Sequence, residues 1–265
     1  MTYKYVFLGI PTYPFNPNSR GLCVILCNSS FKNGTTRLGA DVDVQTLVAT
    51  FSKLNFIVKI EENKSRSQMD MIIRNCGNEK DVSCFVCFIS SHGSLEAVAG
   101  NDGELLTFKE MRSAINDNPE NFLKKIPKIF FIQACQGENY LKIYKDSIDT
   151  KSLGELDSKP ESLEASVLPM DADYCFSVAT TPDHIACRTI IGTVYFQTLC
   201  RIINNLLETN EQISLMNILF RLNGEMGNWI STNASKLAVD PNRLKASICN
   251  IAYCTLSGDV YFQRR

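Results

Sequence analysis

Short and largely apolar runs alternate along this chain with longer segments that repeat apolar residues at helical spacing. The apolar runs predict buried β-strands at residues 21–28, 56–60, 83–90, 128–134, 173–182 and 246–256. The helical spacing predicts helices at residues 40–55, 65–77, 107–117, 193–208 and 213–229. Near-continuous apolar strands separated by helices indicate a mostly parallel sheet that is covered on both faces. We therefore expect an α/β fold with a six-stranded sheet; the length of 265 residues allows one large domain or two small ones.

One segment interrupts this alternation. Residues 138–170 hold seven acidic and four basic side chains with scattered Ser, Gly and Pro, and they show neither a helical nor a strand period. A stretch of this length without structure is uncommon inside a compact domain, and it is usually functional or disordered. We expect a linker at residues 141–170 between two parts of the same domain.

The composition excludes several classes of function. A net charge of −1 provides no basic surface for nucleic acid and no polybasic membrane anchor. No apolar run approaches the roughly 18–20 residues that a spanning helix needs, and the amino terminus lacks the pattern of a signal peptide. Eleven cysteines cannot all pair within the chain, and most lie inside apolar runs. Free buried thiols are typical of a reducing compartment, so we expect a cytoplasmic protein.

The cysteines at positions 84 and 87 form a CxxC pattern, which raises a redox or metal-binding α/β protein as one interpretation. Residues three apart in a strand point to opposite faces of the sheet, so Cys84 and Cys87 would not converge. No cluster of cysteine and histidine has the spacing of metal ligands. We expect no metal and no cofactor.

Two reactive side chains follow neighbouring candidate strands. His92 and Gly93 come after the run at 83–90, and Cys135 comes after the run at 128–134. Sites in open α/β sheets form beyond the carboxyl ends of the strands, so these residues would meet if the two strands are adjacent. His92 would then remove the proton of the Cys135 thiol, and the N–H groups of Gly93 and Cys135 would bind an oxyanion. The alternative is a loop histidine and a core thiol. His184 is the only other histidine.

The sequence QACQG around Cys135, with SHG around His92 lying 43 residues upstream, resembles the caspases. Further matches in the family's order are TTRLGADVDV after the first candidate strand and SVATTPDHIACR after the linker, and the resemblance covers nearly the whole chain. The segment YPFNPNSRG is most similar to the insect executioner branch of the family. The resemblance implies a caspase-like domain and a cysteine endopeptidase that cleaves after aspartate.

The resemblance also implies the residues that bind the substrate. Arg37, Gln133 and Arg188 match the family's aspartate pocket, and the backbone of Arg188 and Thr189 would pair with the extended substrate. Guanidinium groups suit this role because they bind carboxylates through two parallel hydrogen bonds. The alternative is that both arginines are solvated surface residues. The chain departs from many caspases at Cys187 and Thr189, and its following loop is about one residue short, so only the preference for aspartate is predicted.

The family is made as a zymogen that is cut between its two parts. By resemblance, residues 1–20 form a short N-terminal peptide, 21–140 a large-subunit-like part and 171–265 a small-subunit-like part. Asp149 in DSID and Asp157 in GELD, both within the linker, are the candidate processing sites. The alternative is that they are merely acidic linker residues.

Two functions stay open on the sequence. The first is an active protease of apoptosis, activated by linker cleavage and dimerisation. The second is a catalytically weak homologue that regulates a partner caspase by dimerising with it. The expected partners are protein substrates with aspartate at the cleavage position, a second caspase chain in a homodimer or heterodimer formed through residues 246–256, and inhibitor-of-apoptosis proteins. We expect no nucleic acid and no membrane partner.

Overall fold

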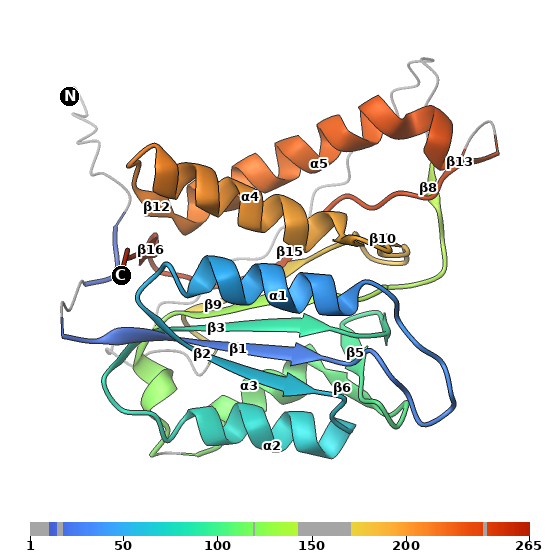
Figure 1. The fold of residues 1–265 in the computed structure, drawn as a ribbon. Coiled ribbons are helices and arrows are strands. Elements are labelled where there is room, and N and C mark those ends of the chain that lie inside the picture. The colour runs from blue at the N-terminus through green and yellow to red at the C-terminus, as the bar shows by residue number, and fades with distance from the viewer. Residues whose placement is uncertain (1–10, 15–17, 119, 143–170, 241–242) are drawn as a thin grey trace, which may run out of the picture.

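The computed structural model describes residues 11–14, 18–118, 120–142, 171–240 and 243–265. A six-stranded sheet forms its centre, with the strand order β15-β9-β7-β3-β1-β2 (Figure 1). Its strands are β1 (Arg20–Cys27), β2 (Phe56–Glu62), β3 (Val82–Ser90), β7 (Lys128–Gln133), β9 (Tyr174–Val178) and β15 (Asn250–Cys254). All neighbouring pairs are parallel except β15 and β9, which are antiparallel. The mostly parallel sheet expected from the sequence is confirmed.

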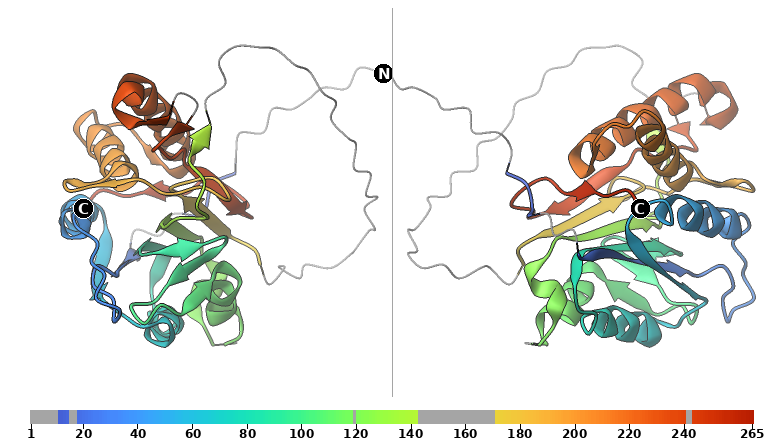
Figure 2. Two further views of the ribbon diagram at one scale, coloured as in Figure 1. Left: turned by 90° about the vertical axis from the view of Figure 1, so that its right-hand side faces the viewer. Right: turned by 60° about the vertical axis from the view of Figure 1, so that its left-hand side comes forward.

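Helices cover both faces of the sheet, as Figures 1 and 2 show. The helices are α1 (Ala40–Phe51), α2 (Arg66–Cys76), α3 (Phe108–Asn116), α4 (Val194–Glu208) and α5 (Leu215–Leu237). Helices α1, α4 and α5 pack on one face, while α2 and α3 pack on the other. Side chains at the helix starts satisfy free backbone N–H groups: Ser65 and Thr107 form capping boxes, and Thr193 caps α4.

Shorter elements complete the described chain. They are the 3-10 helix Phe122–Lys125 and the strands β4 (Gly93–Ser94), β5 (Ala97–Ala99), β6 (Leu105–Thr107), β8 (Leu141–Lys142), β10 (Arg188–Thr189), β11 (Gly192–Thr193), β12 (Ile213–Ser214), β13 (Ala238–Asp240), β14 (Arg243–Leu244) and β16 (Tyr261–Phe262). Two strand pairs matter for the site. Strand β4, which follows His92 directly, pairs with β5, and β10 pairs with β11 as a hairpin. No helix in the described ranges is long and apolar enough to cross a bilayer.

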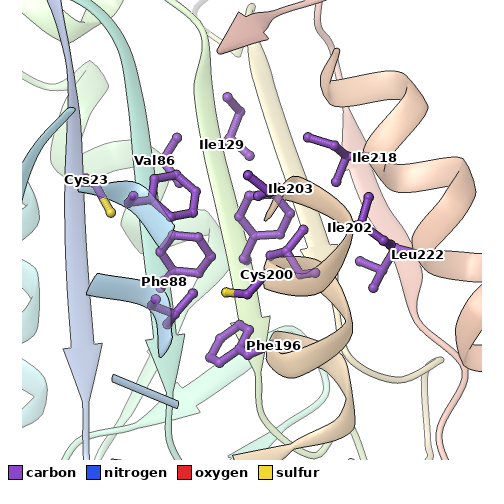
Figure 3. Packing of buried hydrophobic residues seen from close by; sticks show 14 of the residues in the cluster. Cys23, Val86, Phe88, Ile129, Phe196, Cys200, Ile202, Ile203, Ile218 and Leu222 are labelled. Carbon is purple, nitrogen blue, oxygen red and sulfur yellow. The ribbon is translucent and has the colours of Figure 1, made fainter. Parts of the chain in front are cut away.

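The two hydrophobic cores follow from the alternation of side chains along the strands. Cys84 packs with the core under α1, α4 and α5, whereas Cys87 packs with the core under α2 and α3. The two thiols of the CxxC pattern therefore lie on opposite faces of β3, as expected. Figure 3 shows Phe88 on the first of these faces, beside Phe196 and Cys200 of α4.

Several element ends differ from the sequence-based expectation. Helix α5 continues to Leu237 instead of ending at 229, because no proline interrupts it before Pro241 and its two glycines are tolerated within a helix. The last strand of the sheet is confined to Asn250–Cys254, and β9 ends at Val178. Within the described chain, β15 pairs with β9 only, so one of its sides is an open sheet edge.

Candidate active site

His92 and Cys135 lie at the same edge of the sheet because β3 and β7 are parallel neighbours. Each residue is the second one beyond the end of its strand. A Cβ atom added to Gly93 would lie 2.8 Å from Cβ of Ala134 and 2.9 Å from the carbonyl oxygen of Cys135. The loop that carries His92 therefore contacts the loop that carries Cys135, and only glycine fits at position 93 without displacing one of them.

The thiol of Cys135 is half-buried, and its Sγ accepts the Ala186 backbone N–H at 3.3 Å. The second histidine also lies near this loop, because the Gln136 N–H donates to the His184 carbonyl oxygen at 2.9 Å. The ring of His184 is occupied elsewhere: its Nδ1 lies 2.7 Å from the carbonyl oxygen of Pro182. The His184 side chain therefore has a hydrogen-bond partner away from the thiol, whereas His92 follows β3 beside the loop that carries Cys135.

The surroundings of His92 favour its neutral form. Partial loss of hydration, followed by the positive charges of Arg37 and Arg188, lowers the pKa of His92 below its ordinary value of 6.5. The imidazole packs against the ring of Phe31, with ring centroids 4.7 Å apart. A neutral imidazole at pH 7 is able to accept a proton from a thiol, which is what a general base requires.

Arg37 and Gln133 lie buried at the carboxyl ends of the central strands. Arg37 is 5% exposed, and its Nη1 donates to the carbonyl oxygen of Asn28 and to Oγ of Ser90, both at 3.0 Å. Ser90 is the register partner of Gln133 on β7, so Arg37 and Gln133 belong to one layer of the site. Gln133 donates from Nε2 to the Cys187 carbonyl oxygen at 3.5 Å, and its buried Oε1 has no hydrogen-bond partner in the described chain.

Arg188, on β10, brings a second guanidinium to Arg37. Burial, followed by the charge of Arg188, lowers the pKa of Arg37 to about 10. The pKa of Arg188 is also lowered, by burial. Among the described residues, neither arginine takes part in an ion pair, and the Cys135 thiol acts electrostatically on both. Two adjoining and partly desolvated cations beside the thiol suit a small carboxylate, which would compensate both charges.

The residue that joins these parts was not predicted from the sequence. The carboxylate of Asp43, in the first turn of α1, accepts the Thr193 N–H at 2.9 and 3.2 Å and the Gln197 Nε2–H at 2.8 Å. Thr193 is in turn the register partner of Arg188 in the β10–β11 hairpin. Asp43 therefore fastens the hairpin that carries Arg188 to the helix that follows Arg37. The available signal was an acidic residue on the apolar face of a helix.

The remaining candidates lie at the rim of the site or outside the described residues. Thr189 is exposed, and its Oγ1 donates to the Gly192 carbonyl oxygen at 2.7 Å. The hairpin tip beyond it presents Ile190 and Ile191, which are 76% and 73% exposed. The two candidate processing residues, Asp149 and Asp157, fall within residues 143–170, outside the described residues.

The sequence matches known proteins over most of its length. Residues 20–256 match the family model described as the caspase domain. The chain is 29% identical over 261 residues to Caspase-7 of Gallus gallus, which covers 95% of this chain and 81% of that protein. It is 28% identical over 218 residues to Caspase-3 of Bos taurus, covering 80% and 74%. It is 36% identical over 192 residues to Caspase-10 of Homo sapiens, covering 71% of this chain but only 36% of that protein.

Proposed function

Because this chain belongs to the caspase family of cysteine-type endopeptidases, we propose that Cys135 is its nucleophile, His92 its general base, and aspartate the residue after which it cleaves protein substrates in apoptosis. The observation that carries this proposal is the convergence of a thiol, an imidazole and two guanidiniums at one edge of the sheet. This convergence supports the proposal over the alternatives of a loop histidine with a core thiol and of solvated surface arginines.

In the proposed reaction, His92 transfers the protons and Cys135 forms the covalent bond to the substrate. His92 takes the proton of the Cys135 thiol, and the thiolate sulfur attacks the backbone carbonyl carbon of the aspartate residue. The N–H groups of Gly93 and Cys135 stabilise the oxyanion of the tetrahedral intermediate. The imidazolium then protonates the leaving amine as the C–N bond breaks, which leaves a thioester on Cys135. Water, deprotonated by His92, hydrolyses the thioester and restores the thiol.

The proposed selectivity for aspartate comes from the two arginines near the thiol. Arg37 and Arg188 would bind the aspartate carboxylate, with Gln133 beside them, while the backbone of Arg188 and Thr189 pairs with the substrate as an added strand. Since each charge-assisted hydrogen bond contributes about 1.5–3 kcal/mol, a neutral side chain in this pocket would leave two cations unpaired. Ile190 and Ile191 at the hairpin tip offer apolar surface to neighbouring substrate residues.

We further propose that the chain is a cytoplasmic zymogen. Cleavage after Asp149 or Asp157, within the linker at 141–170, would separate a large-subunit-like part (21–140) from a small-subunit-like part (171–265) and free both new chain ends to move. The active assembly would be a dimer, with the open edge of β15 as its interface and a second copy or another caspase as the partner. Inhibitor-of-apoptosis proteins are the candidate inhibitors.

A peptidase assay with matched variants tests the catalytic proposal. Purified protein is incubated with a fluorogenic peptide ending in aspartate, alongside Cys135→Ala, His92→Ala and His184→Ala. We expect turnover to be lost in the first two variants and retained in His184→Ala, because the His184 ring is bound to Pro182. Equal turnover by the wild type and Cys135→Ala would instead favour the second function, a homologue that regulates a partner caspase by dimerisation.

The processing proposal has its own test. Protein kept at high concentration should separate into two fragments, and mass spectrometry should place the new ends after Asp149 or Asp157. The double variant Asp149→Ala/Asp157→Ala should stay as one chain. An unchanged fragment pattern in the double variant would contradict processing at these aspartates.

A further inference from the structure

A second pair of reactive groups lies on the open edge of the sheet, on β9 and β15. The antiparallel register aligns Cys254 of β15 with Cys175 of β9. Cys175 is buried with an exposed fraction of 0%, whereas Cys254 is the one exposed cysteine among the eleven. Both are free thiols in this structure. Neither residue belongs to the site around Cys135.

We propose that Cys175 and Cys254 form a modification site in which a peroxide oxidises the pair to a disulfide that links β15 to β9. This inference rests on the register of the two cysteines and on the exposure of Cys254 in the undimerised chain, and it does not depend on the proposed protease activity.

The register supplies the geometry that a disulfide needs. Directly opposed residues of antiparallel strands have Cα atoms about 4.5–5.5 Å apart, and their side chains lie on the same face of the sheet. Disulfides span Cα separations of about 4.4–6.8 Å, so the register places the two cysteines within the Cα range that a disulfide bridges. The thiols already interact, since Cys175 shares a hydrogen bond with the Cys254 sulfur.

The surroundings of Cys254 make it the sulfur that reacts first. The hydrogen bond from Cys175, helped by the Leu256 backbone N–H, lowers the pKa of Cys254 to about 6. The same hydrogen bond, together with burial, raises the pKa of Cys175 well above its usual range. Thiolate character and solvent access are the two properties that make a cysteine sensitive to oxidation, and Cys254 has both.

The reaction balances with one peroxide per disulfide. The Cys254 thiolate attacks one peroxide oxygen, the O–O bond breaks, and hydroxide leaves while Cys254 becomes a sulfenic acid. The Cys175 sulfur then attacks the sulfenic sulfur, loses its proton and displaces the hydroxyl group as water. The two cysteines lose two electrons in total, and the peroxide gains them. An external thiol reverses the reaction by exchange.

The disulfide would fix an edge strand whose pairing is irregular. The register between β15 and β9 shifts between Ile251 and Tyr253, and β15 has no strand on its other side in the described chain. Such a bulge leaves one residue of the strand unpaired. A disulfide at Cys254 would hold β15 and β9 in register on one side of the bulge. Oxidation would therefore restrict the conformation of this edge strand.

Peptide mapping tests the proposal directly. The intact chain and the variants Cys254→Ser, Cys175→Ser and Cys87→Ser are treated with hydrogen peroxide at pH 7, alkylated with N-ethylmaleimide and digested. In the wild type and in Cys87→Ser, the control for a fully buried thiol, we expect one peptide pair linked through Cys175 and Cys254. Dithiothreitol should separate this pair. Neither Cys254→Ser nor Cys175→Ser should form it.

A second measurement keeps the test independent of folding defects in the variants. Brief alkylation of the untreated wild type should label Cys254 ahead of every cysteine except Cys135, and prior peroxide treatment should abolish that label. Labelling of Cys254 that peroxide leaves unchanged would overturn the proposal. It would be overturned as well if Cys254 were linked to another chain, or if it became a sulfinic acid without joining Cys175.

Discussion

Arg37 is a buried cation whose side-chain hydrogen bonds go to neutral oxygens and not to a carboxylate. Its Nη1 contacts are the neutral oxygens of Asn28 and Ser90, and the nearby charge of Arg188 adds repulsion. Taking a cation out of water without a direct ion pair costs free energy, and the charge of Asp43 offsets this cost only in part, so the pKa of Arg37 is lowered. A bound carboxylate would relieve this cost. Selectivity for aspartate would therefore arise from a destabilised empty pocket as much as from new contacts.

Arg37→Lys tests this account of the pocket. Lysine keeps the charge but loses the planar fork, so at least one of two charge-assisted hydrogen bonds to the substrate carboxylate is lost. We expect kcat/KM for an aspartate peptide to fall by about 10–100-fold, equivalent to about 1.5–3 kcal/mol. The control is Arg201→Lys, whose guanidinium pairs with Glu225 at the surface. Equal kcat/KM in wild type and Arg37→Lys would contradict a role for Arg37 in substrate binding.

The pKa of His92 gives a second prediction at this scale. His184→Ala leaves His92 as the only histidine, so one imidazole signal titrates in the NMR spectrum. Because lost hydration and two guanidiniums disfavour the imidazolium, we expect its midpoint below 6.5. Activity should accordingly persist at pH 6.5 and fall as the pH decreases further through that midpoint, where His92 becomes protonated.

Removing one of the cations should move this midpoint in a defined direction. Adding Arg37→Gln takes away one positive charge, which makes the imidazolium less unfavourable and raises the pKa of His92. A midpoint that stays in place would show that the two side chains do not interact.

At the scale of elements, the order of strands and helices was predictable from apolar periodicity. The side-chain contacts that connect one element to another were not. The periodicity placed His92 and Cys135 after strands that prove adjacent, because strand ends are marked by a switch from apolar to polar residues. The role of Asp43 depends on the packing of α1 against a hairpin about 150 residues later in the chain, which no local pattern encodes. Element ends such as Leu237 were missed because nothing in the sequence stops α5 earlier.

Asp43→Ala tests whether the joint between α1 and the β10–β11 hairpin positions Arg188. The substitution leaves the buried Thr193 N–H and the Gln197 amide without their acceptor, which costs about 1–3 kcal/mol of unfolding free energy. The hairpin would loosen, so we expect KM for an aspartate peptide to rise as well. Urea unfolding and steady-state kinetics measure the two effects.

The matched control for this joint is Asp41→Ala. Asp41 lies in the same first turn of α1 but is exposed, so neither the unfolding free energy nor KM should change appreciably. If the two variants behaved alike, helix-terminal charge in general, and not the bond to the hairpin, would explain any loss.

On the scale of the whole molecule, the two edges of the sheet differ in the strands that connect them to the active-site loops. Strand β2 is the edge strand on one side of the sheet, and β15 is the edge strand on the other. The active-site loops come from the middle of the sheet, from β3 and β7, while β9 connects that middle to β15. An assembly formed through β15 would therefore act on the strand next to the catalytic loops, and one formed through β2 would not.

This asymmetry gives the final prediction, which concerns the proposed dimer. Ile251 on β15 is 38% exposed, and Ile60 on β2 is 46% exposed, so lysine is tolerated sterically at either edge. A charge on an edge strand opposes pairing with a second strand. We expect Ile251→Lys to shift the protein from dimer to monomer in sedimentation experiments and to reduce peptidase activity with it, whereas Ile60→Lys should leave both unchanged. Dimers that persist in Ile251→Lys and dissociate in Ile60→Lys would move the interface to the opposite edge. The open side of β15 would then stay available to a different chain, because the unpaired N–H and C=O groups of an edge strand are able to pair with another strand.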